Sequence, residues 1–161
     1  MPPARTTLTK EWAEAIAAYC GHLRARGFSA GWEAVNFRIT RDMARFVTAR
    51  SAGAASGARP GAVDVASVTG ADLVGYVSHV RERADARALP NPIRYLADHA
   101  HGVRRFFAWA AVHGRVLVDP AEGLAVPRPP SRIPRGILTT GEIARLLEAP
   151  DAATPLGLRD R

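Results

Sequence analysis

Apolar residues recur every three to four positions along five segments of the chain, which is the spacing of one helical face. The first segment spans about residues 8–26, and its apolar positions are Trp12, Ile16, Tyr19, Cys20 and Leu23. The other four segments span about 30–50, 69–80, 91–114 and 139–147. No segment alternates apolar and polar residues as a β-strand does, and the apolar run 116–118 is too short to change this. The pattern predicts an all-α fold.

Capping residues support these boundaries. Residues typical of a helix N-terminus precede four of the segments: Thr9, Thr69, Asn91 and Thr139. Two of them, Thr69 and Thr139, are followed three residues later by an acid, as in a capping box. Small residues fill 51–61, which predicts a mobile loop, and prolines between 127 and 134 exclude helix and favour an extended linker. We therefore expect a four-helix domain over 1–126, a linker over 127–137 and the start of a second domain over 138–161.

The chain is strongly basic, with 22 lysines and arginines against 15 acids and a formal net charge of +7. Such a charge indicates a polyanionic partner, of which nucleic acid is the simplest. A single cysteine excludes an internal disulfide, and the five histidines show no metal-ligand spacing, so we expect no cofactor and no metal. Neither a membrane span nor the apolar core of a signal peptide is visible. We expect a cytoplasmic protein that does not contact membranes.

Arginines gather on the polar face of the second segment. Stepping about 100° per residue from Val35 places the apolar residues between roughly 0° and 120°. The arginines fall at roughly 240–300° on this wheel and are Arg38, Arg41 and Arg45. Asp42 is the one acid within this stripe. Such a helix can enter a DNA major groove, although a solvated face made soluble by charge has the same pattern.

The fourth segment and the linker extend the basic pattern. Arg94, His101 and Arg105 lie nearly opposite the apolar stripe of the fourth segment, and Arg104 lies on its boundary. The linker adds three basic residues without an acid: Arg128, Arg132 and Arg135. Together with the arginines of the second segment, these residues form the predicted surface for double-stranded DNA.

The order of motifs towards the end of the chain resembles that of the tyrosine recombinases, the Xer and phage-integrase family. It runs from residues 103–109 (Val-Arg-Arg-Phe-Phe-Ala-Trp) through Asp119-Pro120 and Leu124 to the Pro-Arg linker, and then from Leu138 to residues 158–161. The resemblance implies that the first domain is a SAM-like, four-helix core-binding domain that grips the recombination site. It also implies that 138–161 begin a catalytic domain, and it allows other recombinase protomers as partners.

One segment imitates the catalytic motif of this family. His101 and Arg104 form a His-x-x-Arg sequence, but in the family that motif lies after the linker and before the tyrosine nucleophile. Here it precedes the linker, and the three tyrosines of the chain all lie upstream of it. We therefore expect no catalytic residue in this chain, and DNA binding without cleavage. Two alternatives stay open: a separate DNA-binding module that competes with an intact recombinase, and a helical protein-interaction domain.

Overall fold

The computed structural model describes residues 8–54, 63–128, 138–151 and 153–160, and all regular elements in these ranges are helical. The elements are α1 (Lys10–Ala25), α2 (Ala30–Ala54), the 3-10 helix η1 (Val65–Ser67), α3 (Gly70–Ala86), α4 (Pro92–Val112), α5 (Thr140–Glu148) and α6 (Pro155–Asp160). The chain forms two compact units, residues 1–129 and 130–161. The all-α prediction is confirmed.

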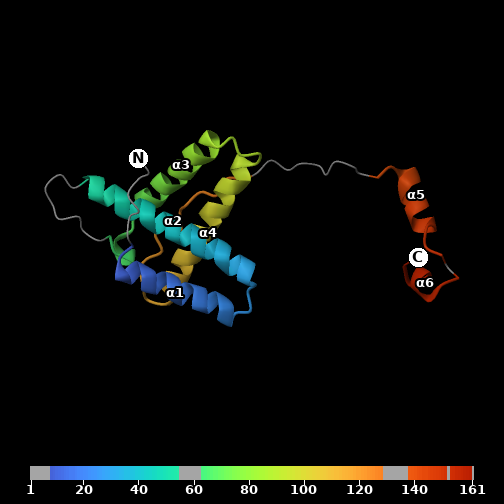
Figure 1. Cartoon of the computed structure of the whole chain (residues 1–161), viewed down its shortest axis with the longest axis horizontal. Coiled ribbons are helices and arrows are strands. Elements are labelled where there is room, and N and C mark those ends of the chain that lie inside the picture. Colours follow the sequence, from blue (N-terminus) through green and yellow to red (C-terminus); the bar gives the residue numbers. More distant parts are fainter. Residues whose placement is uncertain (1–7, 55–62, 129–137, 152, 161) are drawn as a thin grey trace. The chain divides into compact units, whose positions relative to one another are not determined.

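Helices α1 to α4 pack around a single core in the first unit (Figure 1). Helix α2 contacts each of the other three, and α3 also packs against α4. The apolar faces predicted from periodicity are the faces that the packing buries, including all five apolar positions of α1. Five of the largest fully buried side chains are aromatic, and they come from α1, α3 and α4: Trp12, Tyr19, Tyr76, Phe106 and Phe107. Removal of this apolar area from water is the main stabilisation of the unit.

The helix ends follow the predicted capping residues. The Thr9 hydroxyl accepts a hydrogen bond from the Trp12 amide at 3.3 Å, and Thr69 forms a complete capping box with Asp72. Asn91 is the N-cap residue of α4, but its side chain makes no capping hydrogen bond; Pro92 occupies the first turn instead. The structure thus agrees with the sequence about where α1, α3 and α4 begin.

The loop predicted to follow α2 starts later in the structure than the sequence suggested. Helix α2 continues through Ala54, so the prediction of a loop from residue 51 is wrong for 51–54. Alanine has the highest helix propensity, and a single glycine in this stretch costs only about 1 kcal/mol, which an established helix tolerates. The rest of the predicted loop, 55–61, lies outside the described residues. The short helices η1 and α6 were not predicted.

A partly buried polar network links α2, α3 and α4. The guanidinium of Arg83 donates hydrogen bonds of 3.0 and 2.6 Å to the carboxylate of Asp42, and one of 3.1 Å to the Tyr95 hydroxyl. The Tyr76 hydroxyl donates to Asp42 at 3.2 Å and lies 2.6 Å from Nδ1 of His99. Because that hydroxyl has one hydrogen, donation to Asp42 leaves His99 Nδ1–H to donate to Tyr76. The network fixes three helices against one another.

The electrostatics of this network follow from burial and from the Arg83 charge. Burial alone would raise the pKa of Asp42, but the hydrogen bonds and positive charge of Arg83 outweigh it, and the pKa lies below its ordinary value. Burial lowers the pKa of His99 from 6.5 to about 4, against the opposing charge of Asp42. Asp42 is therefore an ionised partner of Arg83, and it does not neutralise the arginines of α2.

The second unit contains α5 and α6. Thr139 and Glu142 form the predicted capping box at the start of α5, with the Thr139 amide donating to the Glu142 carboxylate at 2.8 Å. This hydrogen bond, together with that of the Thr139 hydroxyl, lowers the pKa of Glu142. Helix α5 buries none of its residues, and Ile143, Leu146 and Leu147 are exposed on it.

Candidate nucleic-acid interface

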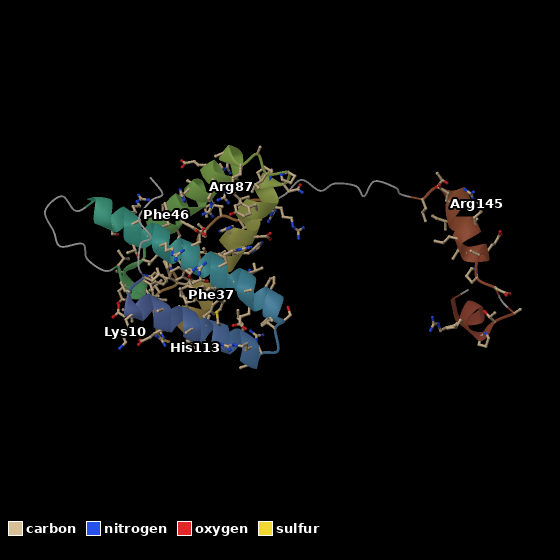
Figure 2. The ribbon with its side chains drawn as sticks, viewed as in Figure 1. Lys10, Phe37, Phe46, Arg87, His113 and Arg145 are labelled. Atoms are coloured by element: carbon tan, nitrogen blue, oxygen red, sulfur yellow. The ribbon has the colours of Figure 1, made fainter. Side chains whose placement is uncertain are left out.

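The arginines of α2 lie on the side of the helix that faces away from the core. Arg38 and Arg45 are exposed, while Ile39 and Met43 on the other side are buried. Arg41 is half-buried, with its guanidinium carbon 5.0 Å from the centre of the Phe37 ring, a cation–π contact (Figure 2 labels Phe37). None of the three makes an ion pair within the described part of the chain. Their charge is available to a polyanion.

A second basic group surrounds a hollow of about 540 Å³ between α4 and the segment that follows residue 123. Three arginines and a histidine contribute to its wall: Arg94, His101, Arg104 and Arg128. The other lining residues are Ala97, Asp98, Leu124, Ala125, Val126 and Pro127. All four basic side chains are exposed. The hollow thus combines two α4 residues of the predicted surface, Arg94 and His101, with Arg128, which lies 27 residues after His101.

Arg105 has a different environment. Its guanidinium carbon lies 4.7 Å from the centre of the Trp32 ring, and its Nε donates a 3.3 Å hydrogen bond to Oδ1 of Asn36. It lines a separate, largely apolar hollow of about 380 Å³ with Phe28 and Trp109. These contacts hold Arg105 against the start of α2, away from the hollow that contains Arg94. Arg132 and Arg135 lie outside the described residues.

Two charged residues of the basic hollow were absent from the residues predicted to bind DNA. Arg104 was assigned to the boundary of the apolar stripe, and Asp98 was not considered. A signal for Arg104 was already present, because it lies three residues after His101, a spacing that places both side chains on one side of a helix. No sequence signal places residues 124–128 beside α4, since they reach it after a turn that only the packing of the chain defines.

The His101–Arg104 pair has no tyrosine beside it among the residues that the structure describes. Both residues face the hollow, but no tyrosine lines it. Tyr19 and Tyr76 are buried in the core, and the Tyr95 hydroxyl accepts from Arg83. No cluster of three or more potential metal ligands occurs among the described residues. Within those same ranges, none of the helices combines the length and apolarity that crossing a membrane requires.

Several curated proteins are similar to this chain. It is 37% identical to "Tyrosine recombinase XerC" of Xanthomonas campestris pv. campestris (strain B100) over 101 residues, which are 63% of this chain and 29% of the relative. Over the same length it is 33% identical to "Tyrosine recombinase XerC 2" of Ralstonia nicotianae, again covering 29% of the relative. It is 28% identical to "Tyrosine recombinase XerD" of Listeria monocytogenes serotype 4b, covering 32%.

The matched part of the chain therefore spans about a third of the length of these curated relatives. No family model matches the chain, and no solved structure matches it.

Proposed function

We propose that this chain belongs to the tyrosine recombinase family and that residues 1–126 are the DNA-binding domain of a site-specific recombinase. In this proposal residues 127–137 are a basic linker, and residues 138–161 begin a catalytic domain. In this proposal the partner is double-stranded DNA and the protein is cytoplasmic. The role of the domain is to hold the recombination site while chemistry takes place elsewhere in the enzyme.

The observation that carries the proposal is the basic hollow beside α4. Three exposed arginines from two parts of the sequence line this one hollow: Arg94, Arg104 and Arg128. Arginine presents several N–H donors in a planar fork that fits phosphate oxygens and guanine. The exposed arginines Arg38 and Arg45 on α2 add further positive charge to the surface of the first unit. A protein-interaction domain without a nucleic-acid partner gives no reason for this concentration of unpaired charge.

Salt dependence of DNA binding tests the proposal. If about five arginines contact phosphates, log K should fall with log salt at a slope of about −4 to −5. Replacing Arg94, Arg104 and Arg128 together with glutamine should reduce the magnitude of this slope by about 2–3. Fluorescence anisotropy with a labelled duplex, at several salt concentrations, measures both slopes.

A matched triple variant separates local contacts from net charge. Replacing Arg26, Arg87 and Arg115 with glutamine removes the same charge from exposed positions that do not line the hollow and make no ion pair among the described residues. We expect this variant to keep most of the parent slope. Equal losses in the two triple variants, or a parent slope near zero, would contradict the assigned surface.

We further propose that this chain binds DNA without cleaving it. Phosphoryl transfer needs a nucleophile and several charges placed together, and the His101–Arg104 pair supplies too few. The test uses a nicked suicide duplex and the purified 161-residue chain. We expect no covalent adduct after denaturation, and His101→Ala should change DNA affinity only, by about 1–3 kcal/mol if His101 touches a base edge. A denaturation-resistant adduct would refute this assignment.

A further inference from the structure

A carboxylate lies within the basic hollow. Asp98 lines it together with Arg94, His101, Arg104 and Arg128, and its side chain is exposed. Residues 94, 98 and 101 follow one another at spacings of four and three, so they share one face of α4. Although basic groups surround it, Asp98 makes no ion pair or hydrogen bond through its carboxylate in the part of the chain that the structure describes. Its oxygens are free to accept from a ligand.

A carboxylate at this position is unfavourable against a DNA backbone, because it repels phosphate within a surface that otherwise attracts it. The same carboxylate is favourable against a hydrogen-bond donor. In the major groove the bases offer two kinds of donor, the N4 amino group of cytosine and the N6 amino group of adenine. Aspartate accepts from cytosine N4, and arginine donates to O6 and N7 of guanine. The Asp98 carboxylate therefore fits a base edge better than a phosphate, whereas the arginines around it fit either.

We propose that Asp98 is a specificity-determining residue that accepts a hydrogen bond from N4 of a cytosine in the major groove. This inference rests on the DNA-binding function proposed above. The arginines on either side supply the attraction: Arg94 is one turn before Asp98, and Arg104 lies farther along the same hollow. Three arginines against one aspartate leave the hollow positive, so the carboxylate restricts which sequence binds without preventing binding.

Selection from a random duplex pool tests the proposal without a known target site. The 161-residue chain is incubated with the pool, and the bound duplexes are recovered and sequenced. For the parent chain we expect one position at which cytosine is favoured by about tenfold or more, in line with the usual cost of one mismatched pair. Asp98→Asn should change the preferred base at that position to adenine, because asparagine pairs with N6 and N7 of adenine. Asp98→Ala should lose the base preference at that position and keep the preferences at all other positions.

A second measurement distinguishes base reading from a general charge effect. Asp98→Ala removes a negative charge from the hollow, so its affinity for duplexes of random sequence should rise while its selectivity falls. Asp85→Ala, which removes an exposed carboxylate from α3 outside the hollow, should leave the preferred bases unchanged.

The possible failures are separable. Salt-sensitive binding in which the cytosine preference survives in both Asp98→Asn and Asp98→Ala would overturn the role of Asp98 and leave the DNA-binding function standing. Salt-sensitive binding with no base preference at any position would do the same. Absence of salt-sensitive binding by the parent chain would overturn the DNA-binding function itself, and the role of Asp98 with it.

Discussion

Gly102 of α4 faces Ile39 of α2, and its replacement by alanine tests the packing of the two arginine-bearing helices. A Cβ atom added at Gly102 would lie 2.7 Å from Cγ2 of Ile39 and 3.0 Å from Cδ1 of the same side chain. Ile39 is buried, and a β-branched residue within a helix has essentially one χ1 rotamer, so it cannot turn away. The clash has to be relieved by movement of the helices.

Two opposing effects set the magnitude. Replacing glycine by alanine inside a helix stabilises it by about 1 kcal/mol. Overpacking a well-filled core costs about 1–3 kcal/mol, and two carbons in close contact favour the upper part of that range. We therefore expect Gly102→Ala to lower the free energy of unfolding by about 1–2 kcal/mol. Urea unfolding followed by far-UV circular dichroism measures this change.

Two further variants make the reasoning refutable. Gly21 lies within α1, and nothing lies within 4 Å of a Cβ added there, so Gly21→Ala should stabilise the unit by about 0.5–1 kcal/mol. Ile39→Ala removes both clashing carbons, so adding Gly102→Ala in that background should stabilise as well, with a coupling of about 2–3 kcal/mol. If Gly102→Ala alone stabilises the protein as Gly21→Ala does, the close approach of α2 and α4 is wrong.

Three other outcomes follow from the structure. Phe107→Ala should lower the free energy of unfolding by about 3–5 kcal/mol, because Phe107 is fully buried, whereas Val112→Ala at an exposed position should have little effect in the same urea titration. Burial lowers the pKa of His99 to about 4, against 6.5 for a histidine exposed by unfolding, so the unfolded chain binds more protons between these values. The contribution of His99 to the free energy of unfolding should therefore be fully present above about pH 6.5 and decrease as the pH falls towards 4, by up to about 1.4 kcal/mol per pH unit. Unfolding curves at several pH values measure this decrease, and His99→Asn should remove it. Replacing Arg128, Arg132 and Arg135 together should reduce the magnitude of the salt slope of DNA binding by about 2–3 without unfolding the domain, and an unchanged slope would exclude the linker from the interface.

The sequence by itself determined which face of each long helix is buried. Apolar periodicity is a local property, because residues three and four apart share a face whatever the helix packs against. This is why the buried residues of α1 and the stripe that contains Ile39 and Met43 were predicted correctly. The helix starts at Thr9 and Thr69 were predictable for the same reason, since a cap acts on amides two or three residues away.

Tertiary structure decided how the polar positions differ from one another. Arg104 and Arg105 are neighbours in sequence, yet Arg104 faces the basic hollow while Arg105 is held by Trp32 and Asn36 of α2. Asp42 appeared to interrupt the arginine stripe of its own helix, but it pairs with Arg83, 41 residues later. Periodicity shows that such side chains point away from the core of their own helix, but not which neighbour they meet. That depends on how the helices cross and on where residues 124–128 return to α4.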